Sequence, residues 1–524
     1  MRDLRPRLHA MPPRNWMNDP NGLVWHDGWY HLFYQHNPYQ PTWGSIHWGH
    51  LRSRDLLCWE ELPFALIPDT AAGEEHCFSG NIVMVAGKPA LFYTSIGPDH
   101  DAHAHAEQWL AHGSPDLVDW QRDPRNPILS VADNGDLAVL EWRDPFVWQE
   151  DGRFCMVLGG TLDNQGCVLI YTSDDLIHWS SPQILYRTSR FRGCECPNYF
   201  ALSQTANEPA VANADTQLLP DGDIRLLLYS PYDNVHAVLG RQTGDNRFDV
   251  MREFNLDEGG AGAFYAANTL LSPDGRRLMF GWISDAARGQ LTDDASRGLD
   301  WNGLQSFPRE IKWLDGRLLI RPVGELAGLR QMLVEPQQMQ SMSSGQPPLP
   351  ERMAAGQPDR FAGDQWFWRA GPAWEFLLTD PGAAPSFELI LTNDASENAT
   401  LNYDAATGRI DLDRSGSSTA VEVDKTARSL QLDQPLQSLQ IFYDNSVLEI
   451  FVNDQVCLTA RVYPLAAAYD RILWIPQMVG RASGHASGCA CVQNNGSGSR
   501  ADISETSVWN LDLPAGGELD VQAD

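Results

Sequence analysis

Long hydrophobic runs are missing from the sequence. No stretch of the 524-residue chain approaches the roughly 20 apolar residues of a membrane-spanning helix. The first ten residues, M-R-D-L-R-P-R-L-H-A, also lack the apolar core of a secretory signal peptide. Both features predict a cytoplasmic protein, although secretion after removal of a signal peptide stays open.

Positive charge is scarce. Thirty-eight basic residues stand against 68 acidic ones, which gives a formal net charge of −30. Such a field repels nucleic acids and anionic membrane surfaces. We therefore expect neither as a partner, and a neutral small-molecule or polysaccharide substrate fits best.

The spacings typical of metal sites are also missing. The nine cysteines include two C-x-C pairs, Cys194/Cys196 and Cys489/Cys491, but none has the C-x-x-C spacing of a zinc site. Their odd number and their scatter through strand-like segments indicate buried free thiols in a reducing compartment. The run H-D-A-H-A-H-A-E at 100–107 resembles a ligand cluster, but a solvated polar loop explains it better. We expect no metal and no cofactor.

Helical periodicity is nearly absent, whereas hairpin signals recur. Pairs of apolar strands joined by a tight turn are typical of antiparallel sheets. Five such turns precede residue 320, at Asp27-Gly28, Gly87-Lys88, Asp151-Gly152, Asp221-Gly222 and Asp274-Gly275. The pattern disfavours alternating strands and helices.

A second repeated element lies between these hairpins. It reads S-R-D-L-L-C-W, S-P-D-L-V-D-W and S-D-D-L-I-H-W, ending at Trp59, Trp120 and Trp179. The resulting repeat of roughly 60 residues suits a four-stranded blade with generous loops. Residues 1–322 are therefore predicted to form a five-bladed β-propeller.

The composition changes after the last hairpin. Residues 323–357 are rich in Gln, Ser and Pro, which predicts a linker or a long crossing loop. Short alternating strands resume over 358–524 and predict a C-terminal β-sandwich. The fold class is thus all-β. We expect the sandwich to stabilise the propeller or to mediate oligomer contacts.

Three acidic residues stand in similar settings near strands of different blades. They are Asp19 in N-D-P-N-G, Asp144 in W-R-D-P-F and Glu195 in C-E-C-P-N. Each by itself can be explained as turn chemistry. A propeller, however, brings loops of different blades together at one end of its channel. Two converging carboxylates are what the cleavage of a glycosidic bond requires.

The motifs around these acids resemble those of glycoside hydrolase family 32, the invertases, levanases, inulinases and related fructosyltransferases. The similarity rests on six motifs in order, W-M-N-D-P-N-G at 16–22, F-Y-Q-H-N-P at 33–38, W-G-H-L-R-S-R-D-L at 48–56, F-S-G at 78–80, W-R-D-P at 142–145 and E-C-P at 195–197. The segment Y-D-N-S-V-L-E-I-F-V-N-D, near residue 450, resembles the family's sandwich domain.

The resemblance implies a retaining β-fructofuranosidase. Asp19 matches the nucleophile that forms a covalent fructosyl-enzyme, and Glu195 matches the general acid/base. Asp144 matches the carboxylate that binds fructose hydroxyls and stabilises the transition state. Arg143 is expected to position Asp144 and to restrain the charge of Glu195. The resemblance also implies contacts of the fructosyl ring with Trp16, Asn18, Gln35, Trp43, Phe78 and Ser79.

Later blades carry looser motifs. They supply the further candidate contacts Asp233, Tyr265 and Trp282, of which Trp282 can equally be a core residue. Arg309 and Glu310 in F-P-R-E are interpreted as a structural pair that closes the propeller.

Several departures from the family pattern concern the leaving group. Asn81 stands where a small serine is usual, and A-A-N-T at 266–269 replaces A-P-Q-T. Arg187, Arg190 and Arg192 precede Glu195 without forming a recognisable phosphate clamp.

The alternatives to a hydrolase of sucrose, fructo-oligosaccharides or fructan follow from the same residues. One is a fructosyltransferase of the same family, and another is an inverting five-bladed glycosidase acting on arabinans or xylans. A third is a fructan-binding protein without catalysis.

Overall fold

The computed structural model describes residues 3–202, 224–243, 247–285, 300–338, 366–379, 385–419, 424–476 and 506–514. Contacts between Cα atoms divide the chain into two compact units. One comprises Leu8–Leu329, Asp454–Thr459 and Leu513–Asp524, and the other comprises Met1–Arg7, Arg330–Asn453 and Ala460–Asp512. None of the helices in the described residues has the length and hydropathy needed to span a membrane.

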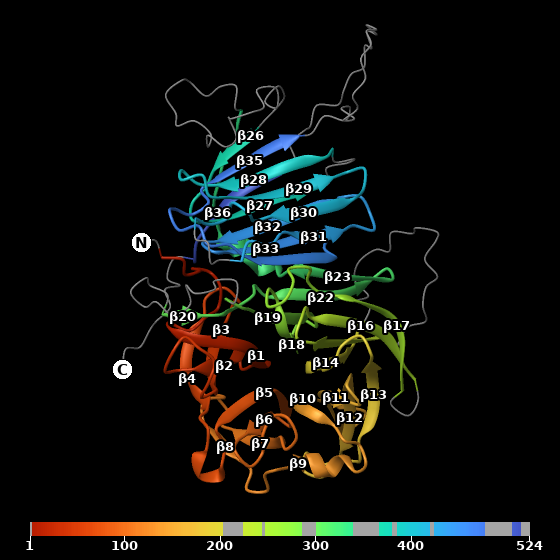
Figure 1. The fold of residues 1–524 in the computed structure, drawn as a ribbon. Coiled ribbons are helices and arrows are strands. Elements are labelled where there is room, and N and C mark those ends of the chain that lie inside the picture. Colours follow the sequence, from red (N-terminus) through yellow and green to blue (C-terminus); the bar gives the residue numbers. More distant parts are fainter. Residues whose placement is uncertain are drawn as a thin grey trace. The chain divides into compact units, whose positions relative to one another are not determined.

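The larger unit contains five antiparallel sheets, which we call blades 1 to 5 (Figure 1). Blade 1 is built from β1 (Asn15–His26), β2 (Trp29–Asn37), β3 (His47–Ser53) and β4 (Glu60–Leu66). Blade 2 is built from β5 (His76–Val85), β6 (Lys88–Ile96), β7 (Glu107–Gly113) and β8 (Trp120–Arg122), with β9 (Leu129–Ser130) beside β7. Two short 3-10 turns, η1 (Thr70–Ala72) and η2 (Val131–Asn134), lie in the connections.

The remaining three blades follow in sequence order. Blade 3 is built from β10 (Leu140–Glu150), β11 (Arg153–Leu162), β12 (Gln165–Ser173) and β13 (Gln183–Thr188). Blade 4 is built from β14 (Glu195–Ala201), β15 (Ile224–Ser230), β16 (His236–Thr243) and β17 (Arg247–Asn255). Blade 5 is built from β18 (Tyr265–Leu271), β19 (Arg277–Ile283), β22 (Arg309–Leu314) and β23 (Arg317–Pro322).

The first strands of the five blades form the centre of this unit. β1 contacts β5, β5 contacts β10, β10 contacts β14, β14 contacts β18, and β18 contacts β1 again. Their labels surround one central point in Figure 1. Five blades around a closed ring confirm the predicted five-bladed propeller.

Every first strand carries a pairing irregularity in its first half. The register with the second strand shifts between Met17 and Pro20, Cys77 and Gly80, Arg143 and Phe146, Glu195 and Asn198, and Tyr265 and Asn268. An irregularity of this kind bends the strand and redirects its side chains. All five therefore lie at corresponding places around one end of the channel.

The hairpin turns follow the sequence closely. Asp27-Gly28 and Asp151-Gly152 join the first two strands of blades 1 and 3, with positive φ at both residues of each pair. Asp274-Gly275 lies in the turn of blade 5. In blade 2 the turn is Ala86-Gly87, one residue before the predicted pair, because Lys88 already belongs to β6. Asp221-Gly222 lies outside the described residues.

The repeated S-x-D-L-x-x-W element forms the turn after the third strand of a blade. In blade 3, Ser173 Oγ accepts the N–H of Leu176 and Asp175 Oδ1 accepts the next two N–H groups. The Trp179 indole donates to the Leu176 carbonyl at 3.0 Å. Leu176 adopts a φ of +71°, and these bonds hold its backbone there.

Two short strands close the ring. β20 (Trp301–Asn302) pairs in parallel with β1, and β21 (Leu304–Gln305) pairs with β19. The same few residues thus join the last blade to the first.

Arg309 and Glu310, interpreted from the sequence as a structural pair, both lie in β22 of the last blade and contact separate partners. Arg309 is fully buried and donates to Asp257 at 2.9 Å and to Thr459 at 2.7 Å. Glu310 accepts from Arg321 at 3.3 Å. Adjacent residues of a strand point to opposite faces, so the two side chains reach different partners.

A six-stranded and a seven-stranded sheet, whose strands belong to the smaller unit except for residues 456–459 of the strand Val456–Arg461, confirm the predicted C-terminal sandwich. The first has the strand order β24 (Arg330–Leu333), β36 (Thr506–Leu511), β27 (Ala373–Thr379), β32 (Ser438–Asp444), β33 (Val447–Val452) and β34 (Val456–Arg461). The second has the order β25 (Gln337–Gln338), β26 (Trp366–Arg369), β35 (Arg471–Pro476), β28 (Phe387–Thr392), β29 (Asn398–Asp404), β30 (Arg409–Asp413) and β31 (Arg428–Gln431).

Aromatic rings fill the space between these two sheets. The ring of Phe376 in β27 stacks on the Trp474 ring of β35, with 6.2 Å between the ring centroids. The ring centroid of Phe387 lies 4.1 Å from that of Trp474. The segment predicted as a linker, 323–357, includes the 3-10 segment η5 (Gly324–Leu329) together with β24 and β25. Its remainder from residue 339 lies outside the described residues.

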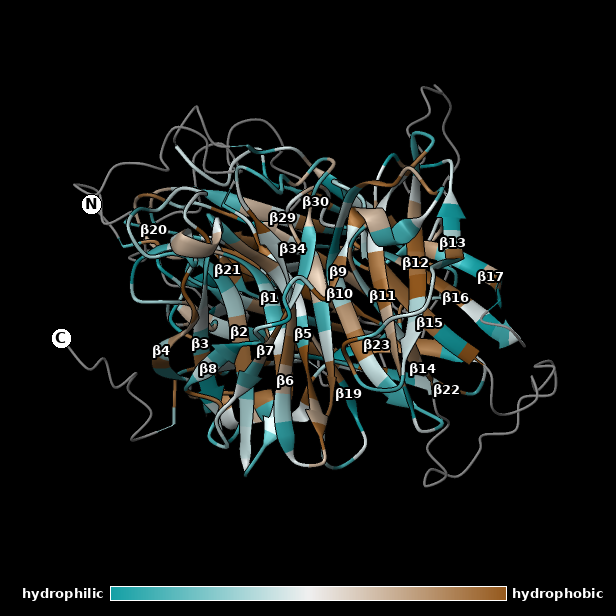
Figure 2. Cartoon of the chain, turned by 90° about the horizontal axis from the view of Figure 1, so that it is seen from below, coloured by the Kyte–Doolittle hydropathy of each residue, from teal (hydrophilic) through white to brown (hydrophobic). Residues whose placement is uncertain are grey.

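Hydrophobic stretches, interspersed with polar residues, run along many of the strands (Figure 2). Seven cysteines are described, all as free thiols, and all but Cys58 are buried. Cys489 and Cys491 lie outside the described residues.

Candidate active site

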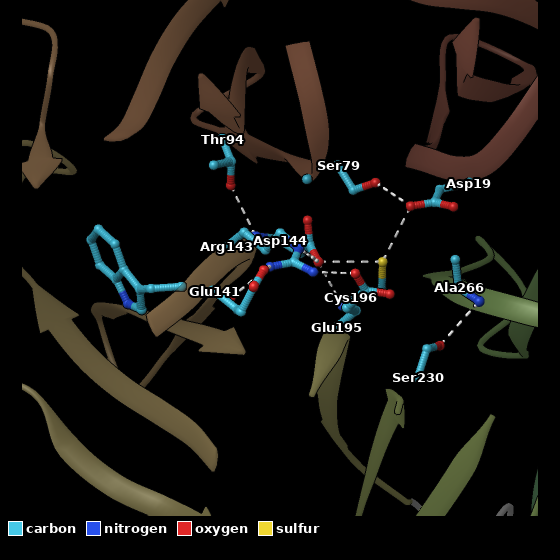
Figure 3. Close-up of polar contacts among 12 residues, drawn as sticks. Asp19, Ser79, Thr94, Glu141, Arg143, Asp144, Glu195, Cys196, Ser230 and Ala266 are labelled. Carbon is cyan, nitrogen blue, oxygen red and sulfur yellow. Dashed lines mark hydrogen bonds and ion pairs between the residues drawn. The ribbon is translucent and has the colours of Figure 1, made fainter. Parts of the chain in front are cut away.

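Asp19, Asp144 and Glu195 meet at the bulged ends of three first strands (Figure 3). The sequence had suggested that these acids lie in loops ahead of the strands. The structure places them in the strands themselves. Asp144 and its neighbour in space Cys196 both have positive φ, +66° and +48°. The redirected backbone turns side chains that would otherwise alternate across the sheet toward the channel.

The Asp19 carboxylate is held by neutral donors. Ser79 Oγ donates to Asp19 Oδ2 at 2.7 Å, and Asn18 Nδ2 lies 3.2 Å from Oδ1. Gln35 Nε2 donates to Ser79 Oγ at 2.6 Å and lies 3.4 Å from Asp19 Oδ2. The Trp16 indole donates to Asn18 Oδ1 at 2.7 Å. This chain of amides and a hydroxyl fixes the carboxylate without adding a positive charge.

Asp144 is 5% exposed. Its Oδ2 accepts the N–H of Cys196 at 2.9 Å, and its own N–H donates to Thr94 Oγ1 at 2.9 Å. Arg143 Nε lies 3.9 Å from Asp144 Oδ2. The Cys196 N–H of blade 4 thus holds the Asp144 carboxylate, and the Thr94 hydroxyl of blade 2 holds the Asp144 backbone.

Glu195 takes two charged or hydroxyl partners and keeps 19% of its side chain exposed. Arg143 Nη2 donates to its Oε1, and the Tyr265 hydroxyl lies 2.5 Å from its Oε2. The Tyr265 hydroxyl also accepts the N–H of Tyr232 at 2.9 Å. Glu195 is therefore the acid of the three that has both a cationic partner and access to solvent.

Cys196 links the three acids. Its Sγ lies 3.5 Å from Asp19 Oδ2 and 3.6 Å from Asp144 Oδ2, while its peptide follows Glu195 directly. Nothing in the sequence beyond its place in E-C-P indicated this role.

Burial changes the protonation of the cluster. Burial, offset in part by the Ser79 hydrogen bond and increased by the charge of Glu195, raises the pKa of Asp19 to about 6. Burial raises the pKa of Asp144 to about 7, against the opposing charge of Arg143.

Most of the other predicted contact residues line the same end of the channel. Asn18, Gln35 and Ser79 are buried around Asp19. The Trp282 ring lies 5.6 Å from that of Trp16 and 6.3 Å from that of Tyr265.

Three predicted contact residues lie farther out. Trp43 is 51% exposed, and its ring lies 6.2 Å from that of Phe78. Asp233 is exposed, and no hydrogen bond among the described residues joins it to the three acids. The residue before it, Tyr232, instead contacts the site: its hydroxyl oxygen accepts a hydrogen bond from Arg143 Nη2 at 2.8 Å.

Two further polar residues were missed from the sequence. Tyr232 is one, and Glu141, two residues before Arg143, is the other: its Oε2 accepts from Arg143 Nη1 at 2.7 Å. The only signal for Glu141 in the sequence is that an acid stands just before Arg143 of the W-R-D-P motif. Strand alternation alone does not show that the Glu141 and Arg143 side chains contact each other.

The unusual asparagines serve the propeller itself. Asn81 Nδ2 donates to the Val147 carbonyl and its Oδ1 accepts the Val147 N–H, both at 2.8 Å. Asn268 Nδ2 donates to the Gly80 carbonyl at 3.3 Å. These bonds join blade 2 to blade 3 and blade 2 to blade 5.

The arginines ahead of Glu195 have partners of their own. Arg187 pairs with Asp163 at 2.9 Å, and the Arg190 guanidinium lies 5.1 Å from the Phe191 ring. In the histidine-rich run, His105 pairs with Asp101 at 2.8 Å and His103 contacts Glu141. Across the described ranges no group of three or more His, Cys, Asp or Glu residues is arranged to hold a metal ion.

Comparison with protein families identifies both parts of the chain. The family description "Glycosyl hydrolases family 32 N-terminal domain" matches residues 9–322, and "Glycosyl hydrolases family 32 C terminal" matches residues 350–477. The chain belongs to glycoside hydrolase family 32.

Relatives in family 32 share about a third of the matched sequence. The chain is 31% identical to the cell wall isozyme of β-fructofuranosidase from Pisum sativum, over 62% of the chain and 60% of the relative. It is 32% identical to sucrose-6-phosphate hydrolase from Escherichia coli, over 62% of the chain and 66% of the relative. The matched region therefore spans less than two thirds of the length of these curated relatives.

Solved structures of family 32 share the fold over nearly the whole chain. Fructan 1-exohydrolase IIa from Cichorium intybus matches with a TM-score of 0.73 at 22% identity, over 98% of each chain. The β-fructofuranosidase of Bombyx mori matches with a TM-score of 0.71 at 24% identity, over 97% of the chain and 94% of that structure.

Proposed function

We propose that the chain is a retaining β-fructofuranosidase that releases fructose from the non-reducing end of sucrose, fructo-oligosaccharides or fructan. The observation that carries the proposal is the meeting of Asp19, Asp144 and Glu195 around Cys196. Membership of family 32 supports it, and the names of the relatives supply the substrate class.

The surroundings of the two reacting acids suit different roles. Asp19 has only neutral partners, so its carboxylate keeps its charge available for attack on the anomeric carbon once it is ionised. Glu195 retains solvent access and lies between Arg143 and Tyr265, which suits a group that must give up a proton and take one back.

The reaction proceeds in two steps. In the first, Asp19 forms a bond to the anomeric carbon of the fructosyl unit while the glycosidic bond breaks, and Glu195 transfers its proton to the leaving oxygen. In the second, Glu195 accepts a proton from water as that water attacks the anomeric carbon and releases Asp19. Asp144 binds the fructose hydroxyls and stabilises the positive charge that develops on the ring.

Two substitutions test the assignment. Asp19→Asn and Glu195→Gln keep the size of the side chains, and each is expected to lower kcat by orders of magnitude with an unchanged circular dichroism spectrum. Hydrolysis at the wild-type rate in either folded variant contradicts the proposal. The same result is expected if the protein only binds fructan and the observed activity comes from a contaminating enzyme.

A parallel substrate panel identifies the natural leaving group. Fructose release is measured on sucrose, sucrose 6-phosphate, inulin, levan and 1-kestose. The ion pair of Arg187 with Asp163 leaves that guanidinium engaged, so we expect no preference for the phosphorylated sugar. A much higher kcat/KM for sucrose 6-phosphate would reject this expectation.

Product analysis separates the hydrolase from the transferase. A hydrolase at high sucrose yields equal amounts of glucose and fructose, whereas a transferase accumulates trisaccharide and an excess of glucose. The anomer formed first, followed by NMR, separates retention from inversion.

A further inference from the structure

Glu141 lies at an unusual backbone position next to the candidate site. It has a φ of +54°, in the left-handed region that glutamate rarely adopts, at the place where β10 shifts its register with β11. Its N–H donates to the carbonyl of His103 at 2.9 Å. A strained residue held by a loop from another blade indicates a functional constraint.

The strained backbone directs the Glu141 carboxylate to Arg143. Arg143 Nη1 donates to Glu141 Oε2 at 2.7 Å and to the Glu141 carbonyl at 2.9 Å. Arg143 Nη2 donates to Glu195 Oε1 and to the Tyr232 hydroxyl at 2.8 Å. One guanidinium, only 7% exposed, is therefore shared between two carboxylates, and Glu195 receives only part of its charge.

We propose that Glu141 is a positioning residue: by sharing the Arg143 guanidinium it weakens the hold of Arg143 on Glu195 and so favours proton donation by the acid/base. The proposal rests on the proposed function, because it assigns Glu141 through the role of Glu195 as proton donor. Glu141 itself does not touch the substrate.

Electrostatics gives the direction of the effect. A full guanidinium charge beside Glu195 favours its ionised form, which cannot protonate the leaving oxygen. The negative charge of Glu141 on the other side of Arg143 opposes that effect. Loss of the Glu141 charge should therefore move the alkaline limb of the pH profile to lower pH.

Other charged and titratable groups face the two carboxylates and remain unchanged in the test. Those around Glu195 are Asp19 of β1, Asp144 of β10, Cys194 and Cys196 of its own segment, Tyr265 of β18 and Tyr232 of the loop after β15. Those around Glu141 are Arg143, Tyr232 and His103, whose ring contacts Glu141 while 81% of it is exposed.

The experiment compares kcat/KM for sucrose between pH 4 and 9 in the full-length protein. Glu141→Gln keeps the length and an acceptor for Arg143 but removes the charge, so its alkaline limb should lie roughly half to one pH unit below that of the wild type. Glu141→Asp keeps the charge and should lie closer to the wild type than Glu141→Gln. The control is Asp151→Asn, which removes one charge at the exposed opposite end of the β10–β11 hairpin and should leave the profile unchanged.

A second pair of variants applies if Glu141→Gln does not fold. His103 is exposed, so His103→Lys and His103→Gln should both fold, and the permanent cation of the lysine should lower the alkaline limb by a few tenths of a pH unit relative to the glutamine. Coincident profiles for this pair overturn the inference in that case.

The remaining outcomes are distinct. A Glu141→Gln profile that coincides with that of Asp151→Asn overturns the inference while the wild-type activity still supports the proposed function. A larger shift in Glu141→Asp than in Glu141→Gln points to a purely structural role and overturns it as well. No fructose release by the wild type from any β-fructoside overturns both.

Discussion

Removal of the Ser79 hydroxyl tests how the nucleophile is kept ionised. Ser79 is 3% exposed, and its Oγ donates to Asp19 Oδ2 at 2.7 Å, which opposes the rise in the pKa of Asp19 caused by burial. Ser79→Ala deletes that bond with little change in volume. The pKa of Asp19 should then rise above about 6, because the ionised carboxylate loses the hydrogen bond that stabilises it relative to the neutral acid.

The size of the shift follows from the strength of the bond. A hydrogen bond to a charged group is worth about 1.5–3 kcal/mol, and one pKa unit corresponds to about 1.4 kcal/mol. Complete loss would therefore raise the pKa by about one to two units. Gln35 Nε2, which loses Ser79 as an acceptor, lies only 3.4 Å from Asp19 Oδ2 and should recover part of this energy. We expect a net rise of about one unit.

The assay is the pH dependence of kcat/KM for sucrose. The first step requires ionised Asp19, so activity falls below its pKa, and Ser79→Ala should move this acidic limb to higher pH. Activity should fall about fivefold at pH 6 and remain nearly unchanged at pH 8. Ser79→Thr, which retains a hydroxyl, serves as the control. An acidic limb that stays in place, or an equal loss of activity at every pH, would refute the reasoning.

Three further predictions concern the site and the propeller. Tyr265→Phe removes the hydroxyl 2.5 Å from Glu195 Oε2. Because a hydrogen-bond donor to a carboxylate favours the ionised form, the alkaline limb of kcat/KM should move to higher pH, and a move to lower pH would contradict the assignment. Burial raises the pKa of Asp144 from 3.8 to about 7. The cost of this shift to folding is absent below the ordinary pKa, grows with pH between the two values and is complete above about 7. Asp144→Asn should therefore increase the free energy of unfolding by about 2–4 kcal/mol at pH 8 and by less at pH 5. A gain at pH 5 equal to that at pH 8 in calorimetry argues against it. Arg309→Met leaves the buried carboxylate of Asp257 without the guanidinium that lies 2.9 Å away. The free energy of unfolding, measured by urea denaturation, should fall by about 3–5 kcal/mol. A fall below about 1 kcal/mol would mean that the hydrogen bonds from Thr459 are enough to stabilise the Asp257 carboxylate.

The predictions at Asp144 and Ser79 share one physical basis. Buried carboxylates are costly to ionise, and a nucleophile must nevertheless be ionised. Ser79, Asn18 and Gln35 lower that cost at Asp19 without an ion pair. The buried carboxylates thus lower the stability of the fold, and replacing Asp144 by a neutral residue should raise it, as is common for residues of functional sites.

Local signals explain how much of the fold the sequence determined by itself. Alternating apolar residues and Asp-Gly turns act over a few residues, so four of the predicted hairpins, at Asp27, Gly87, Asp151 and Asp274, recur within one residue of their predicted places. Repetition of the S-x-D-L-x-x-W element likewise encodes a turn through its own side chains, as in Ser173 and Asp175.

Only the tertiary structure decided which side chains meet. The bulges in the five first strands redirect side chains that period-two alternation assigns to the opposite face, and no local pattern marks them. For this reason the role of Glu141 was not predicted. The motif S-P-Y-D-N-V indicated Asp233, whereas the tertiary structure brings its neighbour Tyr232 to Arg143. Sequence motifs named the acids Asp19, Asp144 and Glu195. Their convergence, and the sharing of one arginine between two carboxylates, depend on strands from separate blades that only ring closure brings together.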